Sequence, residues 1–484
     1  MKKLSKSKIM EGFQCHRKLY FSLYKPELKP PVSVAQQAIF DTGNEVGNLA
    51  RDLFPNGHLI DCEYYELDKA LDDTKKAIDN GLNTIYEAAF GNAQLYCAID
   101  ILHRPSELEP WQIFEVKSGT SAKDVYIKDL AVQCFILNKL GISWDKAHIV
   151  HINNKSTSPN PEDLFCIEDV TNTVLQLQSE IKIEVKKLQS IDEDSDPNTP
   201  IGRHCEKPYD CDYKDTCWKS LPEKTVFNLN DSWKLFDKGY LELDSINPNM
   251  LSALQLKAYN ALMQKKTFID TENLESELSK IKFPVYHLDF ETVAFAIPKY
   301  EGTRPYQQIP FQYSIHLQQD FDDKSPKHFE YLHKQDSDPR RQLAEALVEH
   351  IPTIAKTVMA FNASFENRVI KDLAKAFPDL KDALLSICEK LSDPHPIIKN
   401  NIYHPDFNGS FSLKSVAPAL IGEQGSYKNL EVANGQAAQA QYVRMISGKL
   451  SPEENQKIEF DLLKYCEQDT LVMVKILNWL DLSI

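Results

Sequence analysis

Two acidic residues separated by one position stand out in the stretch YHLDFETVAF, residues 286–295. Asp289 and Glu291 lie in a segment whose other residues are mostly apolar, which is typical of a buried strand. Side chains two positions apart on a strand point to the same face. Because unpaired buried charges are very unfavourable, we expect this pair to bind a divalent cation, Mg²⁺ or Mn²⁺.

Two further acidic residues extend the set. Glu366 follows an expected strand in FNASFENRVI, and Asp469 lies on an expected amphipathic helix, LLKYCEQDTLVMVKIL. Tyr465 precedes Asp469 by one helical turn and shares its face. Four carboxylates and a tyrosine are the components of a two-metal phosphodiesterase, in which the cations bind the attacking and leaving oxygens. We expect the acids Asp289, Glu291, Glu366 and Asp469 to hold the metals and Tyr465 to orient or deprotonate the water.

These motifs resemble those of the DnaQ-like (DEDD) 3′–5′ exonucleases. DFET resembles their first motif, FNASFE the second and YCEQD the third. The Tyr-x-x-x-Asp spacing resembles the tyrosine subgroup, and the resemblance implies an RNase H-like α/β fold. The sequence departs from the pattern at Glu366, because the second motif usually carries Asp. The alternative interpretation is that Asp289 and Glu291 are solvent-facing acids on an edge strand.

A second set of residues lies in CAIDILHRPSELEPWQIFEVKSGT, residues 97–120. Asp100 lies near the end of one expected strand, and Glu115 and Lys117 share a face of the next. We expect Asp100 and Glu115 to hold a cation, and Lys117 to position the attacking water and offset phosphate charge. Glu87, in TIYEAAF, is an additional candidate ligand. A structural strand pair with surface charges is the alternative interpretation.

An Asp followed by Glu-x-Lys on the adjoining strand resembles the core of the PD-(D/E)XK (restriction-endonuclease-like) nucleases. Gln133, on the following helix, matches a glutamine of their RecB-like branch. That branch often carries a histidine on an early helix, where this chain has Gly47. Glu45 and His58 are the nearby candidates to replace it.

Four of the ten cysteines form a third pattern, with Cys15 near the N-terminus and Cys205, Cys211 and Cys217 evenly spaced after the Glu-x-Lys region. Four thiolates suit a 4Fe–4S cluster or a structural zinc ion. The split arrangement resembles the iron–sulfur RecB-like nucleases, including those of CRISPR adaptation and the AddB type, although those usually have one closer cysteine pair. An unrelated Cys15 is the alternative. We interpret the remaining cysteines as small buried residues, namely Cys62, Cys97, Cys134, Cys166, Cys388 and Cys466.

The elements that must position these residues alternate between strands and helices in both halves, which indicates α/β architecture. A chain of 484 residues is too long for one core. We expect a RecB-like domain at 1–218, a helical connector at 219–280 and a DnaQ-like domain at 281–484. Residues 5–26 are expected to form a helix, with basic residues among aromatics that could bind phosphates and stack bases or simply pack. Residues 166–189 also have helical periodicity.

Composition narrows the class of protein. The net charge of −15 argues against a generally basic coat for nucleic acid, but a nuclease needs only a local groove. No apolar run approaches the roughly 20 residues that cross a bilayer, and no apolar signal core follows the first lysines. We therefore expect a cytoplasmic protein without a membrane partner.

The chain as a whole resembles an uncharacterised bacterial family that joins a RecB-like PD-(D/E)XK domain to a DnaQ-like exonuclease domain. Beyond the motifs, the stretches PFQYSIHL, HPDFNGSFSLKSVAPAL and YKNLEVANGQAAQAQY carry this resemblance. It implies the fold and the reaction class but no substrate, and our first hypothesis is a metal-dependent nuclease with two potential centres that acts on DNA in repair or defence. The alternatives are a nucleic-acid-binding scaffold with one or both centres inactive and an RNA-processing exonuclease.

Overall fold

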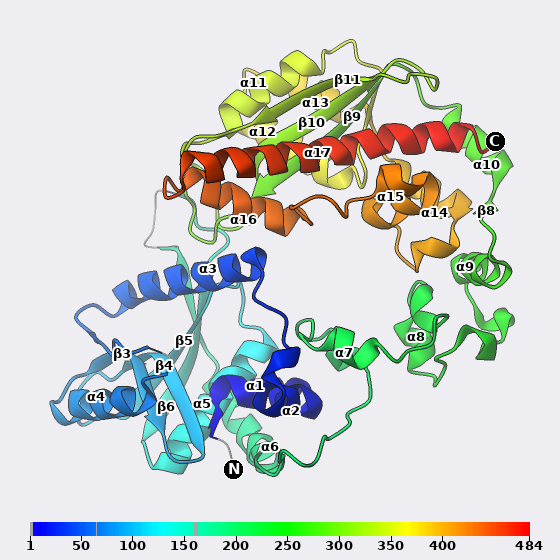
Figure 1. The fold of residues 1–484 in the computed structure, drawn as a ribbon. Coiled ribbons are helices and arrows are strands. Elements are labelled where there is room, and N and C mark those ends of the chain that lie inside the picture. Colours follow the sequence, from blue (N-terminus) through cyan, green and yellow to red (C-terminus); the bar gives the residue numbers. More distant parts are fainter. Residues whose placement is uncertain (1–2, 64, 159–162) are drawn as a thin grey trace. The chain divides into compact units, whose positions relative to one another are not determined.

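The computed structural model describes residues 3–63, 65–158 and 163–484. The chain divides into two compact units, each a mixed α/β body (Figure 1). Unit 1 comprises Met1–Ser220 and Phe295–Tyr306, and unit 2 comprises Leu221–Ala294 and Gln307–Ile484. Each unit is built around its own sheet.

Unit 1 contains a seven-stranded mixed sheet of order β2-β3-β4-β5-β6-β7, with β1 parallel to β4. The pairs β3–β4, β4–β5 and β6–β7 are antiparallel, whereas β2–β3 and β5–β6 are parallel. The strands are β1 (Leu4–Ser5), β2 (His58–Leu59), β3 (Thr84–Gly91), β4 (Leu95–His103), β5 (Trp111–Lys117), β6 (Trp144–Ile152) and β7 (Phe165–Asp169).

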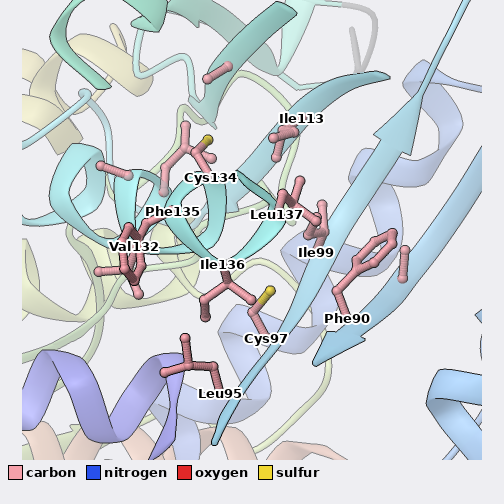
Figure 2. Packing of buried hydrophobic residues seen from close by; sticks show 14 of the residues in the cluster. Phe90, Leu95, Cys97, Ile99, Ile113, Val132, Cys134, Phe135, Ile136 and Leu137 are labelled. Carbon is pink, nitrogen blue, oxygen red and sulfur yellow. The ribbon is translucent and has the colours of Figure 1, made fainter. Parts of the chain in front are cut away.

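Helix α5 (Asp124–Leu140) contributes more buried residues to the core of this unit than any other described helix. Its residues 129–137 are all buried, as expected of a helix that is apolar on most sides. Figure 2 shows Ile136 beside Cys97 and Leu137 beside Ile99, both of β4. The helix ends at Gly141, whose φ of 74° is readily adopted by glycine.

The other helices of unit 1 differ from expectation at two places. The expected helix at 5–26 is broken at Cys15, whose backbone is extended (φ −163°, ψ 125°). The expected helix at 166–189 begins only after β7, because residues 165–169 pair with β6 instead. The helices are α1 (Lys6–Gln14), α2 (His16–Tyr24), α3 (Val34–Ala50), α4 (Leu67–Asp79), α6 (Thr171–Gln189) and α7 (Lys214–Trp218).

Unit 2 contains a five-stranded mixed sheet of order β11-β10-β9-β12-β13. The first three strands pair antiparallel, and β9, β12 and β13 pair in parallel. The strands are β9 (Val285–Val293), β10 (Ile309–Gln318), β11 (Lys327–Leu332), β12 (Thr357–Met359) and β13 (Leu391–Ser392), with a separate pair of β8 (Phe268–Ile269) and β14 (Ile402–Tyr403).

The two faces of β9 have different partners. Tyr286, Leu288 and Phe290 share a core with α11 (Arg340–His350), α12 (Ser364–Ala376) and α13 (Lys381–Cys388). The intervening residues, which include Asp289 and Glu291, lie on the other face, which α16 (Gly435–Ile446) and α17 (Pro452–Asp481) cover. Strand alternation therefore directs both acids toward the helix that carries Asp469.

Helix α17 is 30 residues long and runs along the sheet of unit 2 (Figure 1). It starts with Pro452 after the N-cap Ser451, whose side chain forms a capping box with Glu454. Its C-terminal half shares a core with α15 (Leu413–Ile421) and with residues 226–278, the greater part of the expected connector. That stretch contains α8 (Trp233–Phe236), α9 (Ala253–Gln264) and α10 (Thr271–Leu278). Unit 2 also contains α14 (Pro394–Asn401).

Within the described part of the chain, no helix combines the length and the hydropathy that a membrane span requires.

Candidate functional site

Three carboxylates of unit 2 converge at the face of β9 that α17 covers. One oxygen each of Asp289, Glu291 and Asp469 lies within 4.8 Å of the others. Glu291 and Asp469 are buried, at 7 % exposure each. Residues 289 and 469, which are 180 positions apart in sequence, thus meet at one point.

Glu366 and Tyr465 line the same cavity as this cluster. Glu366 is buried in the first turn of α12, and its Oε2 has no hydrogen-bond partner among the described residues. The turn before α12 is held by Asp393, whose carboxylate accepts hydrogen bonds from the backbone N–H groups of Asn362 (3.1 Å) and Ala363 (3.2 Å). The carboxylate of Glu366 lies outside the tight group of three but faces the same space.

The surroundings of these acids oppose their ionisation. Burial, followed by the charge of Asp469, raises the pKa of Glu291 to about 8 and that of Asp289 well above its usual value. Burial likewise raises the pKa of Glu366 to about 7 and that of Asp469 to about 6. Like charges that crowd together in a buried site need a compensating cation to remain ionised at neutral pH.

Two residues that the sequence did not single out complete this cluster. Lys414, in the first turn of α15, donates a hydrogen bond to the Tyr465 hydroxyl oxygen (2.8 Å). The hydroxyl of Tyr427 donates to Oδ1 of Asp469 (2.6 Å). Both residues lie in stretches that carried the overall family resemblance, FSLKSVAPAL and YKNLEVANGQ. That resemblance was the only sequence signal for them, because neither residue has a fixed spacing from the acids.

Cys466, interpreted from sequence as a packing residue, also contacts the cluster. Its Sγ lies 3.8 Å from Oδ2 of Asp289 and 3.8 Å from the carbonyl oxygen of the same residue. Burial raises the pKa of the Cys466 thiol well above its usual value. The group therefore remains a neutral thiol and packs beside Asp289 rather than acting as a nucleophile.

In unit 1 the Glu-x-Lys residues form a closed ion-pair network. Lys117 Nζ lies 2.6 Å from Oε1 of Glu115 and 2.6 Å from Oδ2 of Asp129. Lys6 Nζ lies 2.9 Å from the same Glu115 oxygen and 3.3 Å from Asp129. Gln133 donates from Nε2 to the other oxygen of Glu115. Burial opposes ionisation of Glu115, but the two ammonium groups outweigh it and hold its pKa below the usual range.

Asp100 and Glu87 lie beside this network but have their own partners. Asp100 accepts a hydrogen bond from the backbone N–H of Val116 (2.7 Å), and burial raises its pKa to about 8. Glu87 forms an ion pair with Arg51 (3.2 Å) and has a φ of 55°, which is unusual for a residue in a strand. Among the described residues, Glu87, Asp100 and Glu115 do not form a three-ligand group.

Lys6, Arg51 and Asp129 were missed by the sequence analysis. Lys6 lies in α1 and Arg51 follows α3, far in sequence from the strands they contact. Asp129 precedes Gln133 by one turn of α5, and this spacing is the only local signal that could have indicated it. Glu45 and His58, the candidates to replace the histidine of the RecB-like branch, are both exposed.

The four cysteines of the split pattern line one small cavity of unit 1. Cys15 lies at the break between α1 and α2, Cys217 is in α7, and Cys205 and Cys211 lie in the preceding loop. The two distant segments are joined by Gln14, whose Nε2 donates to the carbonyl oxygens of His204 (2.8 Å) and Tyr209 (2.7 Å). The break at Cys15 thus places its thiol beside the other three.

Different types of metal centre require different spacings between their sulfur ligands. Among the described residues, no three of these four cysteines place their sulfurs within 4.8 Å of one another. A tetrahedral zinc ion holds its thiolates about 3.8 Å apart, given Zn–S distances of about 2.3 Å. A cluster with an iron at each of four corners holds them farther apart than a single ion does.

Part of unit 2 matches a family model, and the chain has a distant homologue among known proteins. A family model described as a domain of unknown function, DUF2779, matches residues 286–412, which include Asp289, Glu291 and Glu366. The uncharacterized protein MG366 of Mycoplasma genitalium is a distant homologue, 26% identical over 240 residues. This alignment covers 46% of the chain and 35% of MG366, so the chain matches only about a third of that protein's length.

Proposed function

We propose that the chain is a metal-dependent nuclease and that unit 2 carries a 3′–5′ exonuclease centre of the DnaQ-like type. The observation that carries this proposal is the convergence of Asp289, Glu291 and Asp469 within 4.8 Å, with Glu366 lining the same cavity. The mixed five-stranded sheet with helices on both faces is compatible with an RNase H-like fold. A cluster of three acids on a strand and a helix is what such a centre requires.

The residues of this cluster fit Mg²⁺ or Mn²⁺. Carboxylate oxygens are the ligands that these cations prefer, and the raised pKa values indicate a site short of positive charge. Asp289, Glu291 and Asp469 would hold the cations, and the unpartnered Oε2 of Glu366 offers a further ligand. Two bound cations activate water and stabilise the charge on the attacking and leaving oxygens.

The remaining residues position the reactants and ligands. Burial and the neighbouring carboxylates raise the pKa of Tyr465, so its hydroxyl stays protonated. Lys414 donates to that hydroxyl's oxygen, and the Tyr465 side chain also hydrogen-bonds Asp469, so these two neighbours fix the orientation of the hydroxyl group. Of the two roles expected for Tyr465, orienting the water therefore fits better than deprotonating it. Tyr427 holds Asp469 in place, as outer partners of metal ligands commonly do.

The substrate class is a separate part of the proposal. We propose DNA as the substrate, with a role in repair or defence in the cytoplasm; RNA processing is the alternative, because DnaQ-like domains act on either polymer. The test uses single- and double-stranded DNA and RNA labelled at the 5′ end, each with Mg²⁺, Mn²⁺ or EDTA. We expect a ladder of shortening DNA products that depends on metal. Faster digestion of RNA would reassign the substrate, and intact polymers under all conditions would overturn the nuclease proposal.

For unit 1 we propose a RecB-like PD-(D/E)XK fold that binds nucleic acid, with cleavage as the second candidate activity. Both oxygens of Glu115 accept hydrogen bonds, one from Lys6 and Lys117 and the other from Gln133. Because these groups occupy the positions that a metal ion would need, this observation favours binding over cleavage. In this arrangement the carboxylates do not fit a metal ion, so we derive no hydrolytic step here. Binding is tested by the fluorescence anisotropy of labelled DNA, which Lys6→Ala with Lys117→Ala should weaken.

For the four cysteines we propose a 4Fe–4S cluster with a structural role. The four cysteines line one cavity, which supports a shared metal centre, and the resemblance to iron–sulfur RecB-like nucleases favours a cluster over the zinc alternative. Four cysteine ligands occupy every iron corner and leave no open position for a substrate. The cluster would join Cys15 to the segment 205–217, and such a link across a long loop stabilises the folded state by restricting the unfolded chain.

A further inference from the structure

Two histidines and a glutamate of unit 2 form a cluster that the carboxylate centre does not use. One potential ligand atom each of His316 on β10, His328 on β11 and Glu467 on α17 lies within 4.8 Å of the others. His316 and His328 are directly opposed in the antiparallel pair, and their rings stack with centroids 4.5 Å apart. The cluster therefore joins the edge strand β11 and its neighbour β10 to the long helix.

Both rings lie within hydrogen-bond distance of hydroxyl groups. Nδ1 of His316 lies 2.8 Å from the hydroxyl oxygen of Thr470, and Nε2 of His328 lies 2.9 Å from that of Ser314. The two hydroxyl oxygens are 2.7 Å apart, and Thr470 also donates to the carbonyl oxygen of Glu467 (3.2 Å). When these two ring nitrogens carry the protons, they donate to the hydroxyl oxygens and the other nitrogen of each ring is free to bind a metal.

In that arrangement the metal-binding nitrogens would be Nε2 of His316 and Nδ1 of His328, and the latter lies 4.0 Å from Oε1 of Glu467. The other oxygen of Glu467 accepts from Lys464 (2.6 Å), which fixes the carboxylate. Burial lowers the pKa of His316 to about 3, so this ring is neutral, the form that binds metals.

We propose that His316, His328 and Glu467 form a second metal site that binds Zn²⁺. Two imidazoles and one carboxylate are a ligand set of zinc, with water in the fourth position, whereas Mg²⁺ prefers oxygen ligands alone. Ser314 and Thr470 act as the outer partners that orient metal-bound histidines. The site is distinct from the carboxylate centre, and its existence does not depend on the proposed nuclease activity.

The site would also affect the position of α17. Glu467 lies between Tyr465 and Asp469 on this helix, and Thr470 follows them directly. A zinc ion shared by β10, β11 and α17 would fix the helix against the sheet at the turn that supplies both residues to the carboxylate centre. We therefore assign the zinc site a positioning role.

The test is zinc titration of the full-length protein, first stripped with a chelator and then supplied with excess Mg²⁺ to occupy the carboxylate centre. The ligand variants are His328→Gln and Glu467→Gln. Matched controls are His404→Gln, with the same 24% side-chain exposure as His328, and Glu459→Gln, on the same helix with 31% exposure against 29% for Glu467. Any zinc bound by the cysteines is common to all variants, so it does not affect the comparison between them.

We expect the wild type and both controls to bind one more zinc equivalent than either ligand variant. Thr470→Val should retain the equivalent with about 10- to 100-fold weaker affinity, and Thr470→Ser should restore it. Circular dichroism in chelator checks that each variant is folded; if His328→Gln does not fold, the half-exposed Glu467→Gln decides. Equal stoichiometry and affinity in wild type and Glu467→Gln would overturn the proposal.

Discussion

Glu291 is the residue whose ionisation is most directly linked to the metal site. Its folded-state pKa of about 8 lies above the value near 4.3 of an unfolded glutamate. The folded protein therefore binds more protons than the unfolded chain between these values. Its contribution to stability is fully present below the unfolded pKa and is lost as pH rises through the folded pKa.

The first prediction follows from this loss of stability as pH rises. In chelator, the stability of wild type relative to Glu291→Gln should fall by on the order of a few kcal/mol as pH rises from about 4.5 to about 8. Saturating Mn²⁺ should remove most of this difference, because the cation stabilises the ionised form. Thermal unfolding at a series of pH values measures it. Parallel curves for the two proteins in chelator would contradict the assigned electrostatics.

The second prediction concerns the Lys414–Tyr465 pair. Tyr465→Phe should lower the rate of exonuclease turnover by about 100-fold, the lower end of the range for a group that handles the attacking water. Lys414→Ala should lower it by about 10-fold or more, because the tyrosine loses the donor that fixes its hydroxyl. Single-turnover digestion with saturating Mn²⁺ measures both. Tyr331→Phe, a half-buried tyrosine on β11, is the control, and turnover of Tyr465→Phe equal to this control would exclude the role.

At the scale of elements, three pieces of regular structure build the centre: strand β9, the first turn of α12 and the long helix α17. All three were predictable from sequence, because each has strong local periodicity and carries its acid at a motif position. Lys414, Tyr427, Lys6 and Asp129 were not predictable in the same way. Their roles arise from tertiary proximity between segments far apart in sequence, which local spacing does not encode apart from the one-turn separation of Asp129 and Gln133.

The elements that were predicted incorrectly from sequence also depend on tertiary contacts. Residues 166–169 have helical periodicity, yet they pair with β6, since tertiary pairing outweighs a local preference. The break at Cys15 interrupts a helical pattern without a proline or glycine. Its physical reason lies in its partners, because the break brings the cysteine to the segment 205–217.

The third prediction tests this cysteine site. Protein purified without oxygen should be brown from thiolate-to-iron charge transfer, and Cys15→Ala should remove the colour and lower the stability of unit 1. Cys62→Ala, another half-buried cysteine of unit 1, should change neither. Visible absorbance, metal analysis and thermal unfolding give the readouts. Colourless protein with stoichiometric zinc would replace the cluster by zinc, and metal-free protein of normal stability would exclude a shared site.

At the scale of the whole molecule, the two units have separate cores. Loss of the cysteine site should therefore leave the exonuclease centre of unit 2 active. The same separation allows the activities of the two units to be measured independently, by disabling one centre at a time.

The fourth prediction concerns any cleavage that remains after the carboxylate centre of unit 2 is disabled. Cleavage that survives Asp289→Ala with Glu291→Ala should disappear when Lys117→Ala is added, since Lys117 is the basic residue of the Glu-x-Lys set. Lys146→Ala, an exposed lysine on the neighbouring strand β6, is the control. If no cleavage survives the first two changes, unit 1 is a binding module. Residual cleavage that Lys117→Ala leaves unchanged would contradict the assignment of Lys117.

The most direct test of the central claim is Mn²⁺-dependent digestion of a single DNA strand by the Asp289→Ala, Glu291→Ala double variant. Release of a 3′-terminal label should be abolished, because two of the three converging carboxylates are lost while circular dichroism stays that of a folded protein. Glu107→Ala with Glu109→Ala, an exposed pair with the same spacing and charge change, should digest at the wild-type rate. Label release by the Asp289→Ala, Glu291→Ala variant at the wild-type rate would contradict the assignment of this centre.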